Sequence, residues 1–269
     1  MPALITQHFL KQNITGGAFE ALTAAALSQL AIPNFIQGTN ADMLTAWGAD
    51  SANACDFDIR SPSLHDNTRG IRLGYAFQPT VGAGDKTQIL LPDLITQPLY
   101  PSDVLTIEVN GTATNNVGLA YLAYYDNLPG AVQRLISPSE MYARFKNYVG
   151  IRVSVTAGAA GDFGTARLLN ADDDRLIANT DYAVVGLTGQ IPCCTVVMVA
   201  PETSGRPVGC PVHWDANISG DFFVNLSNLY NRPCIPVINS NNRGNITFQA
   251  ASPAGATAVA MEVMLVELG

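Results

Sequence analysis

The side chains that most often carry out chemistry are few in this sequence. It has three histidines, His8, His65 and His213, and five cysteines. The nearest approach to a metal-binding pattern is Cys193-Cys194 followed by Cys210-x-x-His213. Structural zinc sites usually have two ligand pairs, with about two to four residues between the ligands of a pair. Adjacent strand residues point to opposite faces, so two neighbouring cysteines are a poor pair. Packed free thiols are the favoured interpretation, and metal binding by Cys210 and His213 stays open.

A second group combines His65-Asp66 with Asp56 and Asp58. These residues could form an acid/base pair or a metal group, but no nucleophile or third ligand stands at a recognised spacing. The G-x-S-x-G pattern of a nucleophile elbow is absent, and no motif supports a Ser-His-Asp triad. A polar loop is the simpler interpretation. The sequence therefore predicts no catalytic residue, no cofactor and no enzyme activity.

Three consecutive carboxylates, Asp172-Asp173-Asp174, could bind calcium. They lack the glycine and the distal glutamate of an EF-hand loop. A solvated turn is favoured, and a calcium site between subunits stays open because oxygen ligands can come from several loops.

Charge is scarce along the whole chain. Charged residues make up 13% of the 269 residues, against about 25% in an ordinary globular protein. Either other copies of the chain cover much of its surface, or the surface is neutral and rich in hydroxyl and amide groups. The net charge is -8 and only three residues are lysine. No basic run appears, so direct nucleic-acid binding is not predicted.

The cysteines and the first residues indicate where such a chain would reside. An odd number of unevenly spaced cysteines is not a disulfide framework, so buried thiols in a reducing cytosol are expected. The start MPALITQHFL lacks the charged and apolar regions of a signal peptide. The apolar stretch from Ala24 to Ile32 is too short to span a bilayer. We expect a soluble chain that is not exported by the common route.

The strongest structural pattern lies between Asp103 and Asp126. Residues 104–109 and 117–124 each alternate with a period of two, and Asn110-Gly111 stands between them. This pattern predicts an antiparallel hairpin. Both segments are apolar at nearly every position, which predicts strands covered on both faces.

Two helices are predicted. Residues 1–15 show no pattern and are expected to form an extended arm, followed by an amphipathic helix from Ala18 to Leu30 that docks on the body or on a neighbour. Ser137-Pro138-Ser139-Glu140 is a capping box with proline at the first helical position. That helix is expected to run to about Tyr148, with Met141, Phe145 and either Tyr148 or Tyr142 facing inward.

Most of the remaining chain has strand patterns. Residues 34–68 are rich in loop formers with one short strand at Asp56–Arg60. The last strand is long and apolar, which is typical of the interior of a sheet. Further strands are predicted at residues 70–78, 87–91, 149–156, 181–188, 195–200, 222–226, 235–238, 245–250 and 258–268.

Many strands and two helices predict an all-β fold, most simply two tandem jelly-roll-type β-sandwiches. One large sandwich is the alternative. The predicted parts are an N-terminal arm and helix (1–54), a first sandwich (55–136), a connecting helix (137–148) and a second sandwich (149–269).

These features together resemble a known family. The most pattern-like segments are Arg206–Gly209, Gly220–Ser227 (GDFFVNLS) and Pro233–Asn245 (PCIPVINSNNRGN). With the arm, the two β-rich halves and the low charge, the chain resembles the double jelly-roll major capsid proteins of tailless icosahedral viruses, including lipid-containing phages and the adenovirus-like lineage. The resemblance implies a homotrimer of pseudo-hexagonal outline, a shell around DNA or a membrane, and no catalysis.

The sequence therefore predicts a self-assembling viral coat protein, located in the virion after assembly in the host cytoplasm. Its partners would be copies of itself in a shell lattice, with other virion proteins and an internal membrane as further candidates. Two alternatives stay open: a non-viral β-sandwich binding or surface-layer module, and an enzyme on a jelly-roll barrel. The scattered histidines argue against the metal-dependent form of the enzyme.

Overall fold

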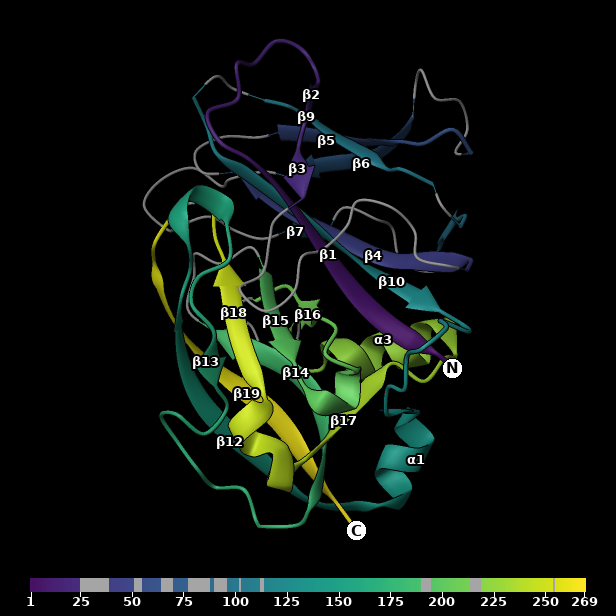
Figure 1. Ribbon diagram of the computed structural model, residues 1–269, viewed down its shortest axis with the longest axis vertical. Helices are drawn as coiled ribbons and strands as arrows, with labels where there is room; N and C mark the ends of the chain where they lie inside the picture. The colour runs from purple at the N-terminus through teal and green to yellow at the C-terminus, as the bar shows by residue number, and fades with distance from the viewer. Residues whose placement is uncertain are drawn as a thin grey trace.

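The computed structural model describes residues 1–24, 39–50, 55–63, 70–76, 88–89, 96–101, 103–111, 114–189, 195–212, 219–253 and 255–269. These residues fold mainly into antiparallel strands. The strands form four sheets, which pack face to face as two β-sandwiches, one above the other in Figure 1.

The first sandwich is built from the first half of the chain. Its strands are β1 (Ala3–Lys11), β2 (Glu20–Ala21), β3 (Thr23–Ala24), β4 (Ala41–Asp50), β5 (Cys55–Arg60), β6 (Ile71–Ala76), β7 (Gln88–Ile89), β8 (Gln97–Leu99), β9 (Thr106–Asn110) and β10 (Val117–Tyr125). One sheet, which we call the middle sheet, has the order β3-β1-β10-β4-β7, and β8 also pairs with β4. The outer sheet has the order β2-β9-β5-β6.

The second sandwich follows a short connection that contains helix α1 (Pro138–Ala143). Its strands are β11 (Leu135–Ile136), β12 (Phe145–Thr156), β13 (Arg167–Leu168), β14 (Asp181–Gly189), β15 (Thr195–Val199), β16 (Val208–Cys210), β17 (Ile235–Asn239), β18 (Thr247–Ala251) and β19 (Ala258–Leu268). The sheets have the orders β11-β17-β14-β19-β12 and β13-β18-β15-β16. Helix α3 (Phe222–Tyr230) and three short 3₁₀ turns, η1 (Ala159–Gly161), η2 (Pro201–Thr203) and η3 (Ser240–Asn245), complete it.

Both sandwiches share one strand order. When β3 and β11 are set aside as extra edge strands, each sandwich has eight strand positions along the chain, and β7 and β8 share the sixth position of the first. In each sandwich one sheet then has the order 1-8-3-6 and the other has the order 2-7-4-5. Strand 1 pairs with 8, 2 with 7, 3 with 6 and 4 with 5, all antiparallel. The two halves of the chain therefore have the same topology.

The middle sheet is buried on both faces. Along β10, Leu119, Tyr121 and Ala123 pack into the core of the first sandwich. The alternate side chains Ala120 and Leu122 pack into the core of the second. This position between two cores explains why every residue of β10 is buried, and it confirms the prediction of a strand covered on both faces for residues 117–124. For residues 104–109 the same prediction is wrong, because β9 alternates between buried and half-buried residues.

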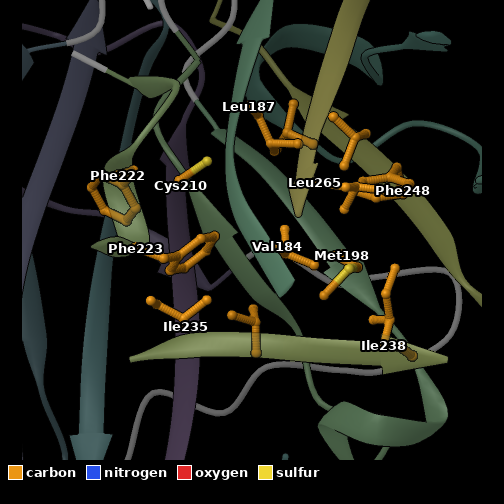
Figure 2. Packing of buried hydrophobic residues seen from close by; sticks show 14 of the residues in the cluster. Val184, Leu187, Met198, Cys210, Phe222, Phe223, Ile235, Ile238, Phe248 and Leu265 are labelled. Carbon is orange, nitrogen blue, oxygen red and sulfur yellow. The ribbon is translucent and has the colours of Figure 1, made fainter. Parts of the chain in front are cut away.

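The core of the second sandwich is closed by helix α3. Figure 2 shows Phe222 and Phe223 of this helix pointing toward Cys210 and Ile235, beside the apolar side chains of the sheets. Deletion of large buried side chains of this kind removes about 2–5 kcal/mol of stability in typical cores.

Several predicted strands are confirmed, but the predicted hairpin is wrong. β9 lies between β2 and β5 in the outer sheet, whereas β10 lies between β1 and β4 in the middle sheet. The period of two correctly predicted both strands, because it reflects which faces are buried. It carries no information about the partner of a strand, and here the chain crosses from one sheet to the other after Asn110.

The N-terminal arm and helix are corrected by the structure. Residues 3–11 form β1, an interior strand of the middle sheet. Residues 20–24 form two short strands, and the rest of the predicted helix, 25–30, lies outside the described residues. Glu20 shows why the start is not helical: its carboxylate accepts hydrogen bonds from the N–H groups of Thr15 and Gly16 and pairs with Lys11.

The loop-rich reading of residues 34–68 is also wrong in part, because it missed β4 at residues 41–50. Since β1 and β4 both belong to the middle sheet, the first sandwich begins at residue 3 and not at residue 55.

The predicted helix start at Ser137 is confirmed, because the Ser137 hydroxyl accepts a hydrogen bond from the N–H of Glu140. The capping box is only half formed, because the Glu140 carboxylate pairs with Arg144 and not with the Ser137 N–H. The helix ends at Ala143 and not near Tyr148, because Phe145 already begins β12 and pairs with Leu268. Met141 is buried as predicted, whereas Phe145 and Tyr148 are exposed.

The predicted strand at 222–226 is a helix. Residues 222–230 form α3, and its buried side chains fall on one helical face. A short run of apolar residues fits a strand and a buried helix equally well, and here packing on β14 and β17 decides. The long last strand is interior as predicted, between β12 and β14.

Candidate functional site

Buried polar and apolar contacts join the two sandwiches along one surface, which we call the seam. At its centre His8 of β1 is fully buried. His8 Nε2 lies 2.9 Å from the carbonyl oxygen of Gly161, and its Nδ1 lies 3.3 Å from Thr195 Oγ1. The indole N–H of Trp47 donates to the same Thr195 oxygen at 2.9 Å. The ring of Phe163 packs edge-on against the His8 ring, with centroids 5.1 Å apart.

One arrangement of protons satisfies this chain of contacts. A neutral His8 donates from Nε2 to the Gly161 carbonyl and accepts the Thr195 hydroxyl proton at Nδ1. The Thr195 oxygen remains an acceptor for Trp47. Burial lowers the pKa of His8 to about 4, so the ring stays neutral at ordinary pH. His8 is therefore a fixed link between the sandwiches and not a proton-transfer group exposed to a substrate.

Backbone groups continue the seam along β1. The N–H of Thr6 donates to the Pro207 carbonyl at 2.9 Å, and the N–H of Gly209 donates to the Thr6 hydroxyl at 2.7 Å. The side chain of Gln133 bonds both backbone groups of Leu4, at 2.8 and 2.9 Å. β1 thus pairs with β10 through its backbone, and both backbone and side-chain groups of β1 bond the second sandwich and the connection that leads to it.

Helix α3 and the residues after it close another part of the seam. The Tyr230 hydroxyl donates to the Leu44 carbonyl at 2.7 Å. Arg232 pairs with Asp42 at 2.6 Å and lies over the ring of Tyr124, 5.0 Å from its centroid. With several independent ties, the seam holds the two sandwiches as one block.

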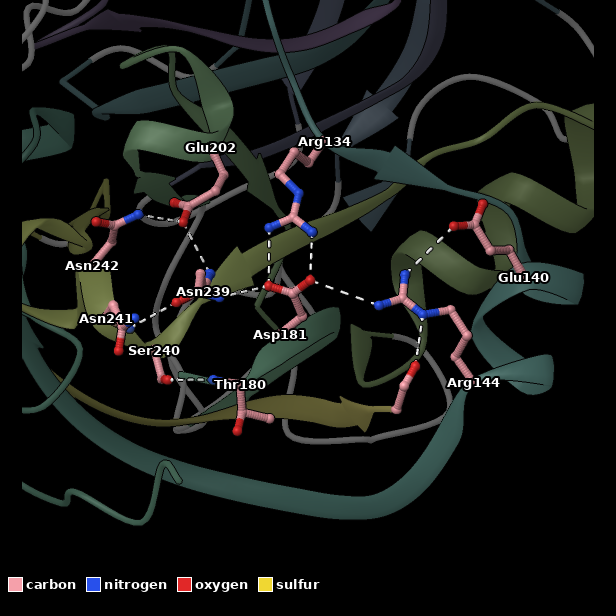
Figure 3. A network of polar contacts seen from close by, with 11 residues as sticks. Arg134, Glu140, Arg144, Thr180, Asp181, Glu202, Asn239, Ser240, Asn241 and Asn242 are labelled. Atoms are coloured by element: carbon pink, nitrogen blue, oxygen red, sulfur yellow. Dashed lines mark hydrogen bonds and ion pairs between the residues drawn. The ribbon is translucent and has the colours of Figure 1, made fainter. Parts of the chain in front are cut away.

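A second polar network fastens the connection between the sandwiches (Figure 3). Asp181 of β14 accepts two hydrogen bonds from Arg134, at 3.0 and 2.5 Å, and lies 3.7 Å from Arg144. Arg144 also pairs with Glu140 and donates to the Gly269 carbonyl at 3.1 Å. The Arg134 guanidinium holds the pKa of Asp181 below its ordinary value. The network fixes α1 and the start of β12 on the second sandwich.

Three exposed aromatic side chains lie on helix α1 and at the start of β12, the segments that this network fixes. Tyr142, Phe145 and Tyr148 have exposed fractions of 64%, 50% and 54%. β12, to which two of them belong, is the edge strand of its sheet. Rigid aromatic side chains are enriched where proteins meet other proteins. We call these three residues the aromatic patch.

No model of a known protein family matches the chain, and no curated protein matches it.

The predicted cysteine and histidine site is only partly described. Cys210 is a buried thiol in β16, and Cys55 and Cys234 are buried thiols as well, which confirms packed thiols for these three. Burial raises the pKa of Cys234 to about 12. Cys193, Cys194, His65, Asp66 and His213 lie outside the described residues.

The predicted group of His65, Asp66, Asp56 and Asp58 is described only in part. Asp56 and Asp58 are buried in β5 of the outer sheet, and the other two residues lie outside the described ranges. Across the described ranges, no group of three or more histidine, cysteine or acidic side chains is placed to hold a metal. No helix there is long and apolar enough to cross a membrane.

The carboxylates of the Asp172–Asp174 turn are each paired with an arginine. Asp172 lies 2.5 Å from Arg167, Asp173 lies 2.9 Å from Arg175, and Asp174 lies 3.1 Å from Arg243. Because each negative charge has a cationic neighbour, the turn is a set of ion pairs, which fits the favoured prediction of a solvated turn.

Sequence reasoning missed the residues of the seam. Trp47 and Thr195 are 148 positions apart, and Thr195 and His8 are 187 apart. No local pattern connects residues at such separations. The one usable signal was the polar run Thr6-Gln7-His8 between apolar residues on both sides, which the prediction of an unpatterned arm over residues 1–15 passed over.

Proposed function

We propose that this chain is the structural subunit of a self-assembling coat, with two jelly rolls in tandem, as in the double jelly-roll capsid proteins that the sequence resembles. The observation that carries the proposal is the strand order 1-8-3-6 and 2-7-4-5, found in both halves. A long antiparallel ribbon of eight strands that wraps into two facing sheets has this order, which is the arrangement of a jelly roll. Jelly rolls are the architecture of many viral capsid domains.

The seam supports the role of a rigid shell subunit. A subunit that contacts several neighbours at once must keep its two sandwiches in a fixed relative orientation. The middle sheet is shared between both cores, and buried polar links such as His8–Thr195–Trp47 fix its position. Such an interface behaves as a continuous core and not as a hinge.

The surface supports assembly as well. The chain has about half of the usual charge, 13% of its residues. Two residues of the aromatic patch, Phe145 and Tyr148, lie on the edge strand β12, and an exposed edge can pair with another chain. The homotrimer, the shell lattice, contacts with other virion proteins or an internal membrane, and residence in the virion all belong to this proposal.

A second candidate is a non-viral β-sandwich binding module. One observation favours it: an open polar groove on the outer face of the second sandwich, lined by Arg152 and Glu262 among others. Jelly rolls also serve as lectin domains.

The proposal is tested by the mass of the purified protein in solution, measured by light scattering after size exclusion. We expect trimers or larger closed assemblies, compared with a single chain of 28.5 kDa. Replacement of Phe145 and Tyr142 by serine should shift the population toward single chains. Ile177→Ser is the matched control, because Ile177 is an exposed apolar residue outside the aromatic patch. A single chain at every concentration would overturn the proposal.

A further inference from the structure

The outer edge of β12 presents backbone groups that no described strand covers. β12 pairs with β19 on one side and is the last strand of its sheet on the other. In an antiparallel strand, the N–H and C=O groups of alternate residues point to the same side. The Ser154 N–H points away from β19, because it donates to the Asp172 carboxylate at 2.7 Å. The backbone groups of Tyr148, Gly150 and Arg152 therefore also point outward, where the described chain gives them no partner.

The open part of this edge is bounded at both ends. At Ser154 the Asp172 carboxylate occupies the position of a further strand. At the other end, the register between β12 and β19 shifts between Phe145 and Asn147, so the regular ladder begins only after that point. Residues 148–152 remain open, and the centre of this segment is Gly150. An open edge without proline is a template for another strand.

Two charged side chains beside the open edge are unpaired. Arg152 and Glu262 are directly opposite on β12 and β19, where an ion pair would be expected. Among the residues that the structure describes, neither takes part in a hydrogen bond or an ion pair. Each charge is therefore available to another molecule.

The Glu262 carboxylate lies over Gly150 and not beside Arg152. A Cβ atom at position 150 would overlap Glu262 Oε1, so the carboxylate occupies the space that any other residue at this position would fill. The pKa of Tyr148 is raised by partial burial and by the Glu262 charge, which agrees with this placement. Glu262 thus extends from β19 across β12 toward the open edge.

We propose that residues 148–152 pair antiparallel with the same residues of a second copy of this chain, about a two-fold axis at Gly150. Gly150 then pairs with Gly150 of the second copy, and Tyr148 of each copy pairs with Arg152 of the other. Each of these pairs exchanges two backbone hydrogen bonds. The same segment serves both copies, as an isologous contact requires.

The charges match in this register. Arg152 of the second copy lies opposite Tyr148 and is a diagonal neighbour of Gly150, over which the Glu262 carboxylate lies. Diagonal neighbours are about 7–8 Å apart, within reach of long side chains. Each unpaired carboxylate therefore meets an unpaired guanidinium of the other copy, which also lies beside the Tyr148 ring.

Other registers and other occupants fit less well. An axis at Arg152 would place two arginines opposite each other, and an axis at Val149 would place Lys146 opposite Arg152. An unrelated extended peptide could bond the same backbone groups. A second copy carries both charges at the matching positions, whereas an unrelated strand need not.

This inference deepens the coat proposal and rests on it in one respect, that copies of this chain associate. It assigns one of the contacts, a two-fold contact between β12 strands. Two-fold contacts combined with three-fold contacts extend an assembly beyond a single trimer.

Disulfide trapping tests the register. Tyr148→Cys and Arg152→Cys are prepared separately in a Cys193→Ser/Cys194→Ser background, then oxidised alone and as an equal mixture. Opposite residues of such a pair have Cα atoms about 5.5 Å apart, which a disulfide spans. Two copies of the same position are offset by four residues, about 13 Å along the strands. We expect disulfide-linked dimers on a non-reducing gel from the mixture only.

Charge reversal tests the same contact without cysteines. Arg152→Glu alone or Glu262→Arg alone brings like charges together at both ends of the contact, so each should raise the dissociation constant about tenfold or more. In a mixed pair of the two variants, every carboxylate again faces a guanidinium. The mixture should therefore recover the association seen by light scattering, a result that a change within one chain cannot produce.

The outcomes separate this inference from the coat proposal. Trimers or shells that form without the mixed disulfide would overturn the inference and leave the coat proposal standing. Disulfide-linked dimers of either cysteine variant alone, or charge variants whose mixture recovers nothing, would also overturn it. Single chains at every concentration would overturn both.

Discussion

Acidification should weaken the seam through His8. In the folded chain its pKa is lowered by burial to about 4, from an ordinary value of 6.5. The unfolded chain takes up a proton near pH 6.5, while the folded chain resists protonation until about pH 4. The stabilising contribution of neutral His8 is therefore complete above pH 6.5 and is lost progressively as the pH falls toward 4.

The magnitude follows from that difference in pKa. Each unit corresponds to about 1.4 kcal/mol, so the loss between the two values is about 3 kcal/mol. The structure gives the reason for so large an effect. A proton on Nδ1 would remove the acceptor for the Thr195 hydroxyl, and complete burial keeps water away from the charged ring.

The assay is urea unfolding from pH 7.5 to pH 4.5, at chain concentrations low enough to prevent assembly. Trp214→Phe leaves Trp47 as the only tryptophan, so fluorescence reports the seam. The comparison is between this protein and its His8→Gln variant, in which the side chain keeps a donor and an acceptor but does not titrate. Their difference in unfolding free energy should shrink by about 1.4 kcal/mol per pH unit below pH 6.5. A difference that stays constant with pH would refute the reasoning.

Three other predictions concern the seam, the groove and the thiols. Thr195→Val should lower the unfolding free energy by about 2–4 kcal/mol, because it leaves Trp47 and His8 without their shared partner; Thr195→Ser keeps the hydroxyl and should lose less than half as much in the same denaturation assay. Gly150→Ala should change the thermal midpoint little, because the flexible Glu262 side chain can leave the space that the new methyl group takes; a midpoint shift as large as that of Thr195→Val would mean that Glu262 is held more rigidly than its contacts indicate. In a Cys193→Ser/Cys194→Ser background, the thiols of Cys55, Cys210 and Cys234 should react with a thiol reagent only at the rate of unfolding, because all three are buried and burial raises the pKa of Cys234 to about 12; rapid reaction in the native state would contradict that burial.

Local patterns predicted the strands of the second sandwich well. Alternation over residues 149–156 and 258–268 reports one buried face, and the structure places β12 and β19 there as direct partners. The N-cap at Ser137 was equally readable, because its hydrogen bond joins residues three positions apart. Signals of this kind depend on neighbours in the sequence, so they can be read without knowledge of the fold.

The predictions that were wrong depend on contacts between residues far apart in the sequence. The partner of β10 is β1, over a hundred positions earlier, and no turn chemistry encodes that choice. The run Phe222–Leu226 fits either a strand or a helix, and only packing on β14 selects the helix. The seam likewise depends on His8, Trp47 and Thr195 meeting after both sandwiches have formed. Residues of the candidate sites were therefore found by structure, while the fold class was accessible from the sequence.

Imaging of the purified protein by electron microscopy tests the coat proposal most directly. The account predicts closed shells, or capsomers of uniform size, whose building block contains two equivalent β-rolls per chain. A uniform population of separate chains, unchanged by concentration or by the Phe145 and Tyr142 replacements, would contradict it.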